Sequence, residues 1–195
     1  MKKVIISFLV ALLSTTTLSA IDYRGFFDLK GGSYTSVFNA TIGVSTTHGI
    51  QLNQNLYFGI GANLSLYPSD NDFDTGSHFA LFGDIRYDMG LTKKWSPYID
   101  LKLGSGLMKE YYFNHTAGDE NKEIDGNMLL INPSVGARLR LSSKCGLNFG
   151  LSYIPFFYKT RAYTRGWDED QSEYDYEEWK SSISNGLFFN IGIDF

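Results

Sequence analysis

The 195-residue sequence has one cysteine, four prolines and, after its first 20 residues, no long apolar run. A single cysteine, Cys145, excludes an internal disulfide. A membrane-spanning helix needs about 20 consecutive apolar residues, and no segment beyond residue 20 provides them. Any residence in a bilayer therefore requires a closed β-barrel, the other structure that satisfies its own backbone in lipid.

Basic residues are also scarce. Without Lys2 and Lys3, which lie in the N-terminal segment, the chain holds 15 basic and 21 acidic residues, a formal charge of -6. An acidic chain repels the phosphate backbone, so we expect no nucleic acid partner.

The N-terminal segment has the composition of an export signal. A positive segment at 1–3 precedes ten uncharged residues at 4–13 and a small, polar stretch at 14–20. Ten apolar residues are too few to span a bilayer as a helix. We predict that 1–20 is a signal peptide removed on export, leaving one domain at 21–195, with cleavage one residue earlier as an alternative.

The last eleven residues show the clearest periodicity. Side chains alternate between the two faces of a strand, and here one face is apolar while the other is mostly small or polar. The apolar face holds Leu187, Phe189, Ile191, Ile193 and Phe195; the other holds Gly186, Phe188, Asn190, Gly192 and Asp194. This pattern is typical of a strand that separates lipid from water.

Seven further segments repeat this alternation. Eight segments of about ten residues match an all-β, eight-stranded, antiparallel, up-and-down transmembrane β-barrel. The predicted strands are 23–31, 38–50, 56–66, 78–89, 97–107, 128–141, 146–157 and 185–195.

Glycines on the polar face indicate which face points inward. Glycine weakens a solvated strand, whereas the narrow lumen of an eight-stranded barrel needs small residues between larger ones. We therefore predict a polar interior and a lipid-facing apolar wall. The glycines concerned are Gly43, Gly59, Gly61, Gly104, Gly106, Gly136, Gly150, Gly186 and Gly192.

The predicted connections differ in length between the two ends of the barrel. Those around 51–55, 90–96 and 142–145 are short, and the opposite set is mostly longer. Outer-membrane barrels combine short periplasmic turns with long external loops. We expect the N-terminus and short turns in the periplasm, and external loops at 32–37, 67–77, 108–127 and 158–184.

The alternation, this asymmetry and the terminal Phe195 resemble the small eight-stranded outer-membrane barrels of the OmpA/OmpX-like, or porin, family of Gram-negative cells. The resemblance covers the whole mature chain and implies residence in the outer membrane among lipid and lipopolysaccharide. It also implies recognition by the barrel assembly machinery during insertion, through a C-terminal signal formed by Phe189, Ile191, Gly192, Ile193 and Phe195. Pro133 and Pro155 depart from the pattern, because each removes a donor from a predicted strand and requires a bulge or local fraying.

Charged residues fall on the inward face of several predicted strands. Charges confined in a lumen must pair or be hydrated, so we predict an ion-pair network that plugs the barrel. A gated pathway for protons, ions or small solutes is the alternative. The predicted network comprises Arg24, Asp28, Lys30, Asp84, Arg86, Asp88, Asp100, Lys102, Arg138, Arg140 and Asp194.

The segment 158–184 mixes acidic residues with aromatic ones. Rigid aromatic rings offer contact area at low entropic cost, so the segment could bind a glycan, a host surface or a partner protein. The alternative is a solvated loop with some strand extension. The aromatic residues are Tyr163, Trp167, Tyr174, Tyr176 and Trp179.

Metal and cofactor signals are weak. Asp70, Asp72 and Asp74 alternate before Gly76, but neither the glycine nor a later glutamate stands where a calcium-binding loop requires it. We predict no cofactor, and only loose attraction of divalent ions by these carboxylates.

Catalysis is also weakly supported. Hydrolysis needs a nucleophile and a histidine within reach, and no serine lies two residues from His48, His78 or His115 on a lipid-facing strand. We therefore predict no enzyme, but an outer-membrane protein with a structural or surface-recognition role. A small pore, or an envelope enzyme acting on lipid A or peptides, remains an alternative.

Overall fold

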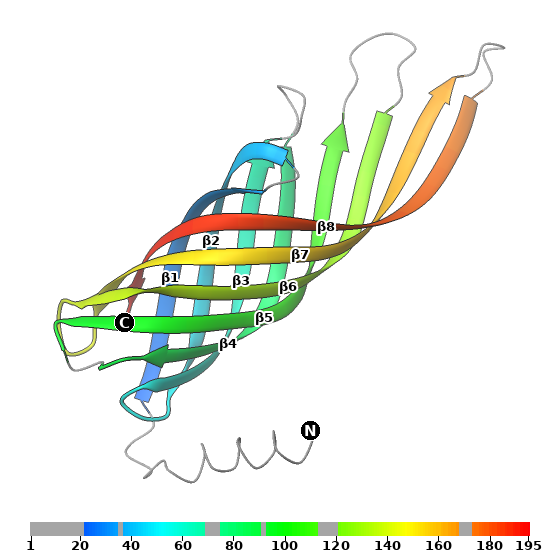
Figure 1. Cartoon of the computed structure of the whole chain (residues 1–195). Helices are drawn as coiled ribbons and strands as arrows, with labels where there is room; N and C mark the ends of the chain where they lie inside the picture. The colour runs from blue at the N-terminus through cyan, green and yellow to red at the C-terminus, as the bar shows by residue number, and fades with distance from the viewer. Residues whose placement is uncertain (1–21, 35–36, 69–74, 91–92, 113–120, 168–172) are drawn as a thin grey trace.

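The computed structural model describes residues 22–34, 37–68, 75–90, 93–112, 121–167 and 173–195. Eight antiparallel strands close into one barrel, each strand pairing with its sequence neighbours and β8 pairing with β1 (Figure 1). The strands are β1 (Asp22–Tyr34), β2 (Val37–Gln51), β3 (Leu56–Pro68), β4 (Thr75–Asp88), β5 (Trp95–Tyr112), β6 (Asn121–Arg140), β7 (Gly146–Trp167) and β8 (Glu173–Asp194). The predicted fold class is confirmed. Among the described residues, no helix is long and apolar enough to cross a bilayer.

Neighbouring strands are staggered in one direction around the barrel. A row of paired residues that starts at Asp22 passes through every strand and returns to β1 at Gly32, ten residues further along. In an eight-stranded barrel this stagger tilts the strands by about 40°. The interior is then just wide enough for side chains to fill.

The two faces of the wall follow the predicted alternation. Ile60 is 74% exposed on the outside, whereas Tyr57, three residues earlier, is fully buried inside. Inward glycines make room for inward rings: a Cβ at Gly136 would lie 2.6 Å from the Tyr98 hydroxyl. Small residues inside and apolar residues outside match the orientation that the glycines predicted.

The C-terminal residue closes the barrel against β1. The Phe195 amide donates to the Gly25 carbonyl (3.0 Å), and the Gly25 amide donates to the Phe195 carbonyl (2.8 Å). The Phe195 ring covers Gly25 and meets the His48 ring edge-on at 6.3 Å between centroids. We call this end of the barrel the terminal end, and the opposite end the hairpin end.

Replacing Gly25 by valine is expected to displace the Phe195 ring, because a Cβ at Gly25 would lie 2.7 Å from it. Overpacking of this kind typically costs about 1–3 kcal/mol, which the urea midpoint of the refolded protein measures. Gly31→Val is the matched control, since Gly31 lies on the same strand face and a Cβ added there would meet nothing within 4 Å. Equal midpoints for the two variants would contradict a packing role for Phe195.

Strands β5 to β8 extend beyond their predicted ends. Most of 108–127 and 158–184 is paired strand, so the prediction of long loops there was wrong. Figure 1 shows these two hairpins continuing past the ends of β1 to β4. These extensions lack the strict apolar alternation on which the strand prediction relied. Their backbone ladders form nevertheless, because main-chain pairing does not depend on it.

The two strand prolines locally break one ladder. Between β6 and β7, pairing stops after Leu130 with Phe156 and resumes at Ser134 with Ser152, without a change of register. The predicted local fraying is thus confirmed, and no bulge is present in this ladder.

Candidate functional site

The lumen holds ten of the eleven predicted charged residues. Each residue is at most 8% exposed, and together they comprise five acids and five bases: Arg24, Asp28, Lys30, Asp84, Arg86, Asp88, Asp100, Lys102, Arg138 and Asp194. Arg140 was misplaced, because it lies at the rim of the terminal end and its Nε donates to the Ser142 carbonyl (3.1 Å). Strand β6 ends at Arg140. The Arg140 side chain is therefore not enclosed by the barrel wall, although its position in the alternation is an inward one.

The first ion-pair group surrounds Asp194 near the terminal end. Arg138 binds this carboxylate with two nitrogens, Nε to Oδ1 at 2.8 Å and Nη2 to Oδ2 at 2.7 Å. Asn148 donates to Oδ1 (3.0 Å), and Arg24 Nε lies 3.4 Å from Oδ2. The bidentate geometry is the strong form of an arginine–carboxylate pair.

Asp88 links Arg24 of this group to one further arginine, Arg86. Its Oδ2 accepts from Arg24 Nη1 (2.6 Å) and its Oδ1 from Arg86 Nε (3.0 Å). The Arg86 guanidinium also lies 3.7 Å from the centre of the Tyr98 ring and 4.6 Å from that of Phe26. Cation–π contacts of this kind compensate for part of the desolvation of a buried cation.

A second group lies deeper in the lumen. Lys102 Nζ is 3.2 Å from Asp100 Oδ2 and 3.5 Å from Asp28 Oδ2, and it faces Asp84 across the β4–β5 pair. Lys30 is 6% exposed and has no carboxylate oxygen within 4.0 Å among the described residues. The network therefore consists of two groups rather than a chain of simple pairs.

An apolar layer fills the lumen between the second charged group and the hairpin end. Its rings interlock: Tyr34 and Phe188 meet edge-on at 5.0 Å, and His78 lies 6.2 Å from Tyr34. We name it the lumen plug; it consists of Tyr34, Ala80, Phe82, Met128, Leu130, Ile154 and Phe188. The lumen plug was not predicted, because the inward face was taken to be polar, although Phe82 and Phe188 have inward parity.

A polar chain lies on the outer wall near the terminal end. The Tyr23 hydroxyl is 2.5 Å from His48 Nδ1, and Thr46 Oγ1 is 2.9 Å from His48 Nε2 and 3.3 Å from the Phe26 carbonyl. The search for a serine two residues from a histidine overlooked threonine, which stands there in β2. In one arrangement of protons the Tyr23 hydroxyl donates to His48 Nδ1, His48 Nε2 donates to Thr46 Oγ1, and Thr46 donates to the Phe26 carbonyl. Because every donor then has an acceptor, these polar groups can lie on an apolar wall.

The crystal structure of Neisserial surface protein A (NspA) is similar to this chain, with a TM-score of 0.57, 9% identity, and coverage of 90% of this chain and 98% of that one. This chain has the fold of a small outer-membrane barrel. The structure of a major outer membrane protein from Thermus thermophilus aligns with a TM-score of 0.49 and 12% identity, over 86% of this chain and 98% of that one. No protein-family model and no curated protein matches the sequence.

The predicted recognition residues of this outer-membrane barrel lie on the hairpin of β7 and β8, not in a loop. Trp179 is 54% exposed, and Lys159 Nζ lies 4.8 Å from the centre of one of its rings. The backbones of Tyr163, Trp167, Tyr174 and Tyr176 pair within this hairpin; their side chains lie outside the described part.

Other predicted sites fall outside the described residues. These are the carboxylates Asp70, Asp72 and Asp74, and His115. Within the described ranges, no three histidine, cysteine, aspartate or glutamate side chains group to hold a metal ion.

Proposed function

We propose that this chain is an integral outer-membrane protein that binds a partner protein through the sheet extending from its hairpin end. Its apolar wall would sit among lipid and lipopolysaccharide after insertion by the barrel assembly machinery. The terminal end and short turns would face the periplasm, and the hairpins would lie outside the cell.

One observation carries this proposal: β8 continues past the end of β1. Pairing between these strands stops at Tyr34 with Gly186, whereas β8 pairs with β7 back to Glu173. From Glu173 to Ile183, β7 is the one strand neighbour of β8 among the described residues. An open strand edge is a template for pairing with another chain.

Pro155 in β7 shows which residues of β8 direct their backbone N–H and C=O groups to the open edge. Its missing N–H breaks the ladder to β6 but not the ladder to β8, so odd-numbered residues of β7 point their backbone groups toward β6. Even-numbered residues of β7 and β8 must then bond to each other. The odd-numbered residues of β8, including Glu177 and Ser181, direct their N–H groups to the open edge.

The filled lumen supports binding rather than transport. The residues of the lumen plug and of the charged groups beneath it are at most 8% exposed. A solute would have to displace apolar rings and separate buried ion pairs to pass.

We predict that prolines at Glu177 and Ser181 weaken partner binding without unfolding the hairpin. Each removes one edge N–H and leaves the β7 ladder intact. Two lost hydrogen bonds at about 1 kcal/mol each correspond to a roughly thirtyfold increase in Kd. The full protein in lipid nanodiscs would be tested by surface plasmon resonance against immobilised β-sandwich domains that have an open edge strand.

The matched control is Glu177→Ala with Ser181→Ala, which changes the same side chains but keeps both amides. It should bind like the wild type if main-chain pairing is the source of affinity. Equal binding by the proline and alanine variants would refute edge pairing, and no binding by the wild type to any such domain would refute the proposed function.

A further inference from the structure

The interrupted ladder between β6 and β7 has a specific chemical consequence. Pro133 and Pro155 lie on opposite strands, and the three opposed positions from Ile131 to Pro133 lack ladder pairing with 153–155. The register is the same on both sides. The strands therefore remain aligned, while the two hydrogen bonds that the proline nitrogens would donate are absent.

The direction of the carbonyl groups shows which atoms lose their partners. The Val135 oxygen lies 3.1 Å from a Cβ position on Gly150 of the opposite strand, so odd-numbered carbonyls of β6 point across this seam. Pro155 accordingly faces the Ile131 carbonyl, and Pro133 faces the Tyr153 carbonyl. Neither proline has an N–H to donate. Within the described part of the chain, no other hydrogen bond to these two oxygens is present.

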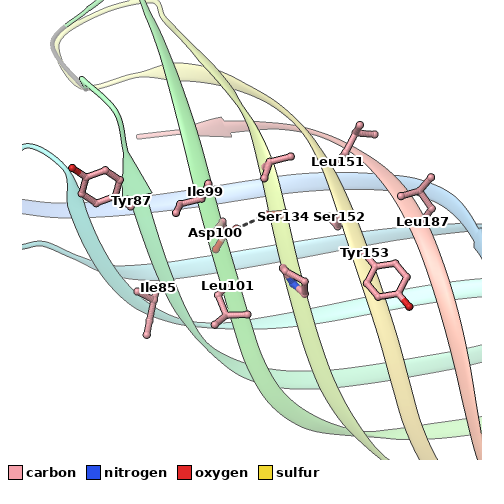
Figure 2. A pocket seen from close by; sticks show the side chains of 12 residues that line it. Ile85, Tyr87, Ile99, Asp100, Leu101, Ser134, Leu151, Ser152, Tyr153 and Leu187 are labelled. Atoms are coloured by element: carbon pink, nitrogen blue, oxygen red, sulfur yellow. Dashed lines mark hydrogen bonds between the residues drawn. The ribbon is translucent and has the colours of Figure 1, made fainter. Parts of the chain in front are cut away.

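The outer wall is hollowed over the end of the seam where Pro133 faces Tyr153. Figure 2 shows apolar side chains of β4 to β8 around it, with Tyr87 and Tyr153 on opposite sides. The hollow is lined by Ile85, Tyr87, Ile99, Asp100, Leu101, Pro133, Ser134, Val135, Leu151, Ser152, Tyr153 and Leu187. Its surface is almost entirely apolar, which suits a hydrocarbon chain.

Acceptors also predominate on the lumen side of the seam. Asn132 lies between the two unpaired positions on β6, is 1% exposed, and its Oδ1 has no hydrogen-bond partner in the described structure. The Ser134 hydroxyl is already used, since it donates to Asp100 Oδ2 at 3.2 Å. The lumen side of the seam thus adds one unpaired acceptor to the two carbonyls.

The depth of the seam restricts what can supply that donor. Seven paired rows, from Ser134 to Arg140, separate it from the terminal end. With about 3.4 Å per residue and a tilt of about 40°, these rows rise roughly 18 Å. A bilayer core is about 30 Å thick, so the seam lies near its middle, away from lipid headgroups. Unpaired carbonyls at this depth are costly.

We propose that the hollow binds one acyl chain that carries a hydroxyl group, and that this hydroxyl donates to the Tyr153 carbonyl. The acyl chain lies along the apolar lining, and its hydroxyl supplies the donor that Pro133 lacks. The same chemistry is available from an esterified lipid or from a free hydroxy fatty acid.

The experiment compares lipids retained by the full protein in nanodiscs by native mass spectrometry. The probes are phosphatidylcholine with a 12-hydroxystearoyl chain, the same lipid with a stearoyl chain, and free 12-hydroxystearic acid. One hydrogen bond of about 1 kcal/mol predicts roughly fivefold preferential retention of hydroxylated over plain chains. Preference for the ester or for the free acid identifies the source, and either result supports the site.

Pro133→Val with Pro155→Val restores both N–H donors and should abolish the preference. Pro97→Val is the matched control, because Pro97 lies in β5 within an unbroken ladder; it should leave the preference unchanged. Val135→Phe fills the hollow without altering the backbone and should lower retention of the hydroxylated chain. Equal retention of hydroxylated and plain chains by the wild type would overturn the proposal, as would an unchanged preference in the Val135→Phe variant.

Discussion

Replacing Asp194 by alanine is expected to lower the free energy of unfolding by about 3–5 kcal/mol, the usual cost of removing one partner from a buried ion pair. Asp194 is 1% exposed and accepts hydrogen bonds from Arg138, Asn148 and Arg24. Its removal leaves Arg138 in the lumen without its bidentate partner. The charge cannot escape to water, because it lies behind the barrel wall.

Unfolding of the refolded protein in lipid vesicles, followed by tryptophan fluorescence in urea, measures this change. Asp22→Ala is the matched control, since Asp22 is an exposed carboxylate on β1 at the same end of the barrel. The double change Asp194→Leu with Arg138→Met should recover much of the lost stability, because it removes both charges together. Indistinguishable midpoints for Asp194→Ala and Asp22→Ala would show that the network contributes little to stability.

Opening the lumen plug is expected to change a non-conducting barrel into a conducting one, because water that enters through the opened plug hydrates the charged groups beneath it and loosens their ion pairs. Phe188 and Leu130 are each 2% exposed within the plug. Replacing both by alanine removes the side chains that separate the charged groups from the hairpin end, and water can then enter the space. We expect no stable current steps from the wild type in planar bilayers, and discrete steps from this variant.

Phe189→Ala is the control for the same strand, because Phe189 faces outward with 53% exposure. It should remain non-conducting. Large-to-small changes of this kind cost about 2–5 kcal/mol each, so Phe188→Ala alone should also be recorded in case the double variant folds poorly. Conductance by the wild type would instead support the small-pore alternative.

The stability test at Asp194 and the conductance test at the lumen plug both concern the interior of the barrel. The charged groups and the lumen plug fill the interior, whereas both proposed binding sites lie outside the lumen. The extended sheet at the hairpin end and the hollow over the β6–β7 seam are independent of each other, so failure of one test leaves the other intact.

Much of the architecture could be predicted because a strand alternates its side chains locally. Period two, together with the glycines of the polar face, assigned Asp28, Lys102 and Asp194 to the interior and Ile60 and Leu187 to the wall. The extensions of β5 to β8 could not be predicted in this way, because these segments lack the alternation. Arg140 was misplaced for a related reason: alternation gives direction but not distance from the rim.

The sequence by itself determined which side of the wall each residue occupies. Only the closed barrel decided which residues meet across the lumen, because contacts such as that between Arg24 and Asp194, 170 residues apart, depend on closure and stagger. Likewise, the sequence placed two prolines in strands. It did not show which of the two neighbouring strands each missing N–H would have faced. The register of β6 against β7 decided that both missing donors fall on one seam and leave two carbonyls facing them.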